Sequence, residues 1–100
     1  MAEIYVFKIT IIGKGGHGSD PKLSNNPITP SVKIYLRYLD LLKRLKFKHK
    51  INSTLPFFNA GSASNVVPDK AFLQGTFRSL EKGVGEVFKE EFENIVKEEC

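Results

Sequence analysis

The chain has 100 residues, a single cysteine at position 100, a formal net charge of +4 and an apolar fraction of 41%. These values are those of an ordinary globular protein, and they predict one domain, residues 1–100, with a modest core. One cysteine excludes an internal disulfide, so packing alone must hold the fold. The apolar runs are too short to span a bilayer and the N-terminus lacks the pattern of a signal peptide, so we expect no membrane partner. The compartment is unknown, with the cytoplasm favoured.

The predicted elements follow from periodicity, capping and turn signals. The first is a strand from Ile4 to Ile12, in which alternate residues are apolar. Pro56 has no N–H to donate to a neighbouring strand, so the second strand is predicted to lie at a sheet edge. A helix starts at Thr29-Pro30-Ser31, with Thr29 as its cap, and ends near Lys46. A strand from Ile51 to Asn59, a turn from Gly61 to Asp69 and a strand from Lys70 to Arg78 follow. The last element is a helix from about Val84 to Lys97.

The order β-α-β-β-α predicts an α+β fold. It is the ferredoxin-like arrangement, an antiparallel sheet with two helices on one face, with the last strand missing. Without that strand, the first strand keeps an unpaired apolar edge. Glu98 and Glu99 stand at a helix C-terminus, where the helix dipole disfavours acids. We therefore expect a truncated fragment of a larger protein.

The first helix is apolar on two faces rather than one. One stripe consists of Val32, Tyr35, Leu36, Leu39 and Leu42. The other, rotated by more than a quarter-turn, consists of Ile34, Tyr38, Leu41 and Leu45. The first stripe can cover the sheet, so the second is predicted to be a homodimer interface, with the edge strand pairing across a two-fold axis. The alternative is that polypeptide outside these residues covers the second stripe.

The most informative segment is the loop from Gly13 to Ile28, where four glycines surround His17. Glycine tolerates backbone paths that a side chain forbids, at a cost in ordering entropy. The loop is therefore predicted to hold the imidazole outside the core, toward another molecule. An anion-binding glycine loop with Lys14 is the alternative, but no P-loop pattern is present and no helix follows directly.

Three segments resemble the metallopeptidase family that includes aminoacylases, hippurate hydrolases, auxin-conjugate amidohydrolases and carboxypeptidases. They are Gly13 to Pro21, Gly61 to Asp69 and Gly75-Thr76-Phe77-Arg78. Together they extend the resemblance over nearly the whole chain. It is a resemblance to the inserted lid, or dimerisation, domain of such enzymes, which interrupts a larger catalytic domain that holds a paired metal site.

The resemblance implies roles for three residues. His17 would reach the active site of the opposite subunit and hydrogen-bond the oxyanion formed at the attacked amide. Asn65 would bind substrate through its amide, and Arg78 would grip a substrate carboxylate with its planar fork. From the residues alone, Asn65 suits a turn and Arg78 a surface ion pair. His49 is expected to be structural.

The resemblance also implies where the metals and partners lie. The parent enzyme would hold two divalent ions of the zinc or manganese class in its catalytic domain. This chain has only His17 and His49 and no matching ligand set, so we expect no cofactor in it and no catalysis by it alone. The expected partners are a second copy, the catalytic domain of the parent chain, and an N-acyl amino acid or peptide substrate.

A ferredoxin-like RNA-binding module is the alternative function. Such sheets stack bases on aromatic residues of their central strands, and here Tyr5 and Phe7 lie on the first strand and Phe72 on the third. However, Phe72 and Phe77 point to opposite faces, and the Lys/Arg-Gly-Phe/Tyr pattern of such strands is absent. The basic residues that give residues 1–50 a net charge of +7 largely fall on one solvated helix face. We therefore expect no nucleic-acid partner.

Overall fold

The computed structural model describes residues 3–13, 16–17, 26–61 and 66–100. Every predicted strand and helix is present, with boundaries within two residues of the prediction, and two short strands are added inside the predicted loops. The elements are β1 (Glu3–Ile12), β2 (Gly16–His17), α1 (Ile28–Lys48), β3 (Ile51–Ala60), β4 (Val66–Val67), β5 (Lys70–Ser79) and α2 (Val84–Glu99).

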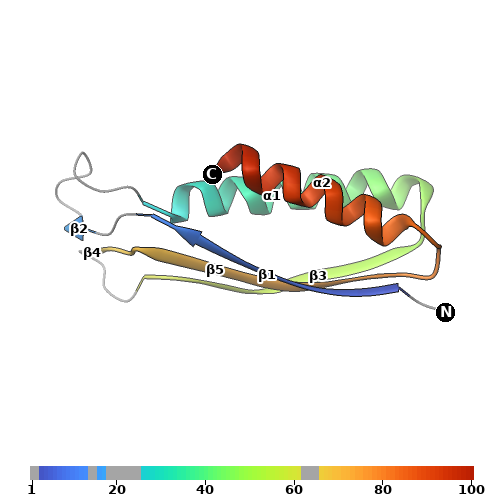
Figure 1. The fold of residues 1–100 in the computed structure, drawn as a ribbon, viewed down its shortest axis with the longest axis horizontal. Coiled ribbons are helices and arrows are strands. Elements are labelled where there is room, and N and C mark those ends of the chain that lie inside the picture. Colours follow the sequence, from blue (N-terminus) through green and yellow to red (C-terminus); the bar gives the residue numbers. More distant parts are fainter. Residues whose placement is uncertain (1–2, 14–15, 18–25, 62–65) are drawn as a thin grey trace.

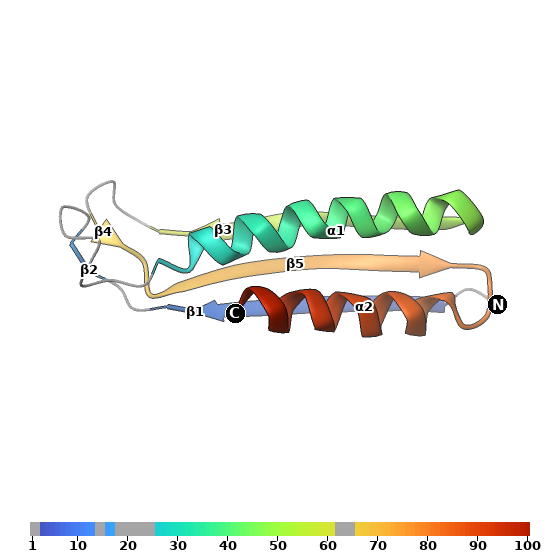
Figure 2. The same ribbon diagram turned by 90° about the horizontal axis from the view of Figure 1, so that it is seen from above.

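The three long strands form an antiparallel sheet in the order β1-β5-β3, and both helices lie on one of its faces (Figure 1). This confirms the α+β prediction with the β-α-β-β-α order. Strand β3 lies at one edge, as Pro56 indicated, and its register shifts between Thr54 and Phe57. Strand β1 forms the other edge. Seen from above, α1 lies on the side of β3 and α2 on the side of β1 (Figure 2).

Helix α1 begins before its predicted cap. The prediction that Thr29 caps the helix is wrong, because the helix already starts at Ile28 and the N-cap residue is Pro27, which makes no side-chain hydrogen bond to the helix. The side chain of Asn26 takes that place, and its Oδ1 accepts a hydrogen bond from the N–H of Ile28 at 3.0 Å. An asparagine just outside the helix thus satisfies one of the free donors of the first turn.

The core lies between the sheet and the two helices and is rich in aromatic rings. Phe77 of β5 stacks on Phe88 of α2 with ring centroids 4.2 Å apart. Phe7 of β1 and Tyr38 of α1 meet Phe92 at 5.1 and 5.6 Å. These rings connect both helices with two strands of the sheet.

The stripe predicted as a dimer interface is part of this core. Ile34, Tyr38, Leu41 and Leu45 are all buried, with relative exposures of 0, 1, 0 and 7%. That prediction is wrong, because a side chain already covered within one chain has no apolar surface left for a second copy. The stripe left open is the one assigned to the sheet, since Val32, Leu36 and Leu39 are 44, 59 and 43% exposed. Of that stripe, Leu42 alone is buried in the core.

The acids at the end of α2 have a partner within the chain. The guanidinium of Arg37 in α1 donates to Glu98 at 2.6 Å and to Glu99 at 3.1 Å. A cation therefore offsets the unfavourable position of both acids at the helix C-terminus.

A clasp at the opposite end joins α1 to the β5–α2 connection. His49 Nδ1 lies 3.0 Å from Glu81 Oε1, and the N–H of Lys50 donates to Glu81 Oε2 at 2.6 Å. The hydrogen bond with His49, and then that from Lys50, holds the pKa of Glu81 below its ordinary value. His49 thus has the structural role expected of it.

Burial of the inner stripe predicts its effect on folding. Leu41→Ala should lower the free energy of unfolding by about 2–5 kcal/mol, because it leaves a cavity in the core. The matched control is Val87→Ala in α2, where the side chain is half exposed and the change should stay within about 0.5 kcal/mol. Urea denaturation followed by circular dichroism measures both. Equal effects of the two variants would contradict this description of the core.

The clasp predicts a pH dependence of stability. A carboxyl whose pKa is lower in the folded than in the unfolded chain stabilises the fold above its unfolded pKa, and this contribution is lost as the pH falls through the folded pKa. Glu81→Gln should therefore lower the melting temperature at pH 7 and lose that difference below about pH 4. Thermal melts across this range measure the effect. Glu90→Gln, at an exposed position of α2, is the control and should leave the profile unchanged.

Candidate active-site arm

A two-stranded ribbon forms one end of the molecule, beyond the ends of the long strands (Figures 1 and 2). In it β2 pairs with β4 in antiparallel register, Gly16 with Val67 and His17 with Val66. At the base of the ribbon the N–H of Gly13 donates to the carbonyl oxygen of Asp69 at 2.8 Å. The glycine-rich loop is thus anchored by its backbone to the loop between β3 and β5.

The ribbon brings together the two segments on which the predicted site depends. His17 lies in β2, and Asn65 directly precedes the partner strand β4 in the sequence. Asn65 itself lies outside the described residues. The pairing was missed because residues 61–69 were assigned to a turn. The two β-branched residues Val66 and Val67 were a signal for a strand at this position, though not for its partner, since such residues favour strands.

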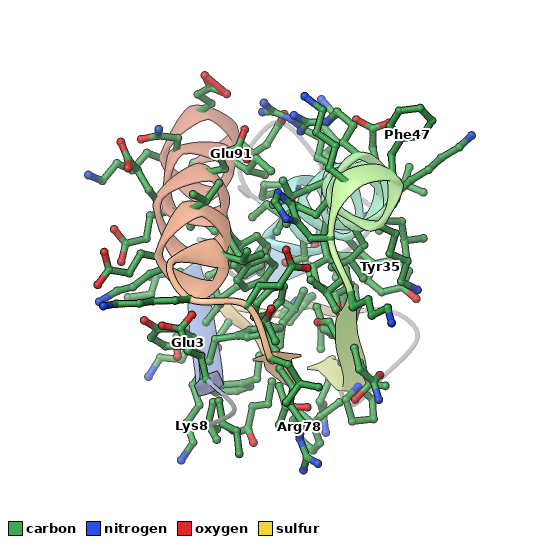
Figure 3. The ribbon with its side chains drawn as sticks, turned by 90° about the vertical axis from the view of Figure 1, so that its right-hand side faces the viewer. Glu3, Lys8, Tyr35, Phe47, Arg78 and Glu91 are labelled. Atoms are coloured by element: carbon green, nitrogen blue, oxygen red, sulfur yellow. The ribbon has the colours of Figure 1, made fainter. Side chains whose placement is uncertain are left out.

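The third predicted site residue lies at the other end of the molecule. Arg78 is exposed near the end of β5, opposite Ile4 and Asn52, and Figure 3 views that end directly. Lys70, where β5 begins near the ribbon, is eight residues away, which is about 26 Å at the usual rise of a strand. The structure therefore does not bring Arg78 to His17 within one chain. The role of Arg78 in binding substrate stays a prediction, and another chain or domain would have to supply the rest of that binding site.

The described residues offer neither a metal centre nor a membrane span. Among them, no three His, Cys, Asp or Glu side chains are placed to hold a metal ion together. Neither α1 nor α2 combines the length and hydropathy needed to cross a bilayer. These described residues thus provide no ligand set for the paired metal site of the family that the sequence resembles.

Known proteins share both the sequence and the fold. The chain is 35% identical to thermostable carboxypeptidase 2 of Saccharolobus solfataricus over its full length, and 29% identical to the hippurate hydrolase of Campylobacter jejuni over 97% of its length. It spans only 26% of each relative. A solved structure from methicillin-resistant Staphylococcus aureus covers 98% of the chain with a TM-score of 0.90 at 24% identity, and 26% of that protein is covered.

A family profile matches nearly the whole chain. The profile is described as the peptidase dimerisation domain, and it matches residues 4–100. That range includes the three-stranded sheet except for its first residue, Glu3, and it includes both helices and the ribbon that carries His17. This chain belongs to the peptidase dimerisation domain family.

Proposed function

We propose that this chain is the lid and dimerisation domain of a metal-dependent amidohydrolase or exopeptidase. The ribbon of β2 and β4 is the observation that carries the proposal. It sets the loop of His17 beside the loop of Asn65 at one end of a molecule 50 Å long. His17 lies in β2, and Asn65 directly precedes the paired strand β4 in the sequence; both residue types are suited to binding a carbonyl or carboxylate. The relatives' names, which include a carboxypeptidase and a hippurate hydrolase, support an N-acyl amino acid or a peptide as the substrate.

His17 would act on the substrate rather than on the fold. When an amide carbonyl is attacked, negative charge develops on its oxygen, and a positioned N–H donor stabilises that charge. The imidazole of His17 would supply this donor to the active site of the opposite subunit, and Asn65 would bind the substrate through its amide. The catalytic domain of the parent chain would hold the metals, for which the described residues provide no ligand set.

The homodimer would form along the outer flank of α1 and the free edge of β3. Val32, Leu36 and Leu39 are exposed on α1, and α1 covers the part of the sheet next to β3. Tyr35 and Phe47 lie on the same flank, away from α2 (Figure 3). An exposed apolar stripe beside an unpaired strand edge is what an interface between two copies needs.

The apolar area of this α1 stripe indicates whether it can hold a dimer together without the β3 edge. Three side chains that are half exposed have about half of their burial energy left to gain, or about 2–4 kcal/mol per subunit. Association costs about 4–15 kcal/mol. Because a symmetric dimer buries one stripe from each subunit, the two stripes together are barely sufficient to offset this cost. Hydrogen bonds between the two β3 edges would have to add to it. The register shift and Pro56 would leave only part of that edge able to pair.

The edge of β1 would bind a further strand from the same polypeptide in the parent enzyme. An apolar groove of about 490 Å³ runs between β1 and α2, with Phe7, Phe88, Phe92 and Val96 among its lining residues. Cys100, at the end of α2, borders a second hollow together with Ile12 at the end of β1. A strand that followed α2 would therefore start at that end and run antiparallel to β1, which supports the proposal that the domain is a fragment.

The dimer proposal predicts the effect of one charge. Leu36→Asp should convert a dimer into a monomer of 11.2 kDa, because it places a carboxylate in the apolar stripe. Lys33→Asp is the control, since it adds an acid to the polar side of the same helix. Sedimentation equilibrium at micromolar concentrations measures the mass. A wild-type chain that is folded and monomeric under these conditions would contradict the proposal.

The role of His17 predicts a kinetic signature in the full-length enzyme. His17→Ala should lower kcat by about 10²–10³-fold with little change in KM, because it removes a donor used in the transition state. His49→Ala, in the clasp, is the control and should keep kcat. If His17 serves the opposite subunit, mixing the His17→Ala protein with one inactivated in its catalytic domain should restore activity through hybrid dimers. Full turnover by His17→Ala would rule out the oxyanion role.

A further inference from the structure

The face of the sheet opposite the helices is uncovered and carries charges of one sign. Every charged side chain that the three long strands place on this face is basic, namely Lys8, Lys70 and Arg78. Lys8 and Arg78 point away from both helices (Figure 3). Acidic residues of the described chain lie elsewhere, on the helices, in the connections and at the start of β1. This face is therefore suited to a negatively charged ligand.

Two aromatic rings lie among these cations. Phe72 of β5 is opposite Thr10 and Asn59, and Phe57 of β3 is opposite Gln74. Gln74 is two residues from Phe72, so the two rings are diagonal neighbours on adjacent strands, about 7–8 Å apart. They are 43% (Phe57) and 40% (Phe72) exposed, although both are large and apolar.

The residues around the rings can form hydrogen bonds as well as ion pairs. Gln74 and Asn59 carry amides that both donate and accept, and each stands directly across from one of the rings. Lys8 is opposite Gln74 on the other side, and Lys70 is two residues before Phe72 on the same strand. Stacking rings, base-edge amides and phosphate-binding cations thus occupy one patch, which we call the outer platform and define as Lys8, Phe57, Asn59, Lys70, Phe72 and Gln74.

We propose that the outer platform binds single-stranded nucleic acid. Phe57 and Phe72 would each stack on a base, Lys8 and Lys70 would contact phosphates, and the two amides would contact base edges. An acidic peptide would explain the cations but not the paired rings. The sequence alone argued against this function because Phe72 points to the face opposite Phe77 and the Lys/Arg-Gly-Phe/Tyr pattern is absent; the other candidate rings were Tyr5, Phe7 and Phe77. Those three belong to the core side of the sheet, and the strand register supplies Phe57 in their place.

The test is a titration of the 100-residue chain against labelled oligouridylate and oligothymidylate, followed by fluorescence anisotropy. We expect saturable binding that weakens as salt rises from about 50 to 200 mM. Phe57→Leu and Phe72→Leu should each weaken it by about 5- to 150-fold, since each keeps an apolar side chain but removes a stacking ring. Phe58→Leu is the matched control, because Phe58 has the same 40% exposure and is opposite Leu73, which faces the core. It should leave binding unchanged.

Further variants and competitors complete the test. Lys8→Gln should reduce the salt dependence by about 0.7 in the log–log slope, as expected for one phosphate contact to a single strand. Tighter binding of either oligonucleotide identifies RNA or DNA as the ligand, and both results support the platform. Failure to bind either one at low salt overturns the proposal. So does displacement by polyglutamate that is unaffected by the Phe variants, because it would identify an acidic protein as the partner. Circular dichroism verifies that each variant is folded.

Discussion

Stacking between Phe77 and Phe88 is the contact on which the rest of this small fold depends. Their rings are 4.2 Å apart and inclined by only 13°, and they join the central strand β5 to α2. Phe7 and Tyr38 add the edge strand and the other helix to the same cluster. Because a 100-residue chain with one cysteine has neither a large core nor a disulfide, this single aromatic layer must position every other element. Both helices pack on the same face of the sheet, so the other face stays uncovered within this chain. The edges of β1 and β3 are also left without a neighbouring strand.

The element order could be read from the sequence, but the orientation of α1 could not. Both of its stripes repeat at helical spacing, so periodicity gives no reason to bury Ile34 rather than Leu36. The choice depends on contacts between distant residues. The hydroxyl of Tyr38 lies 2.6 Å from Ser53, which in turn donates to the carbonyl oxygen of Thr76. This chain of hydrogen bonds crosses three elements, and burial there raises the pKa of Tyr38.

Local chemistry also explains which parts of the site could be anticipated. The glycines around His17 pointed to a projecting loop, and the structure places His17 in the short strand β2 of the ribbon. The pairing of β2 with β4 joins residues fifty positions apart, which no local pattern encodes. Backbone conformation and distant contacts also explain the glycines at the start of α2. Gly83 adopts a φ of +88°, and a side chain at Gly85 would collide with the ring of Tyr5.

The elongated shape of the domain has a mechanical consequence. Its principal extents are 50, 21 and 16 Å, and the ribbon lies at one end of the long axis. Rigid strands running most of that length make the domain a lever whose far end travels furthest when the body rotates. A small rotation of the domain about α1 would therefore move His17 further than it moves the residues close to the axis of rotation. In the lid proposed above, such a geometry would convert small adjustments between subunits into larger movements of the ribbon.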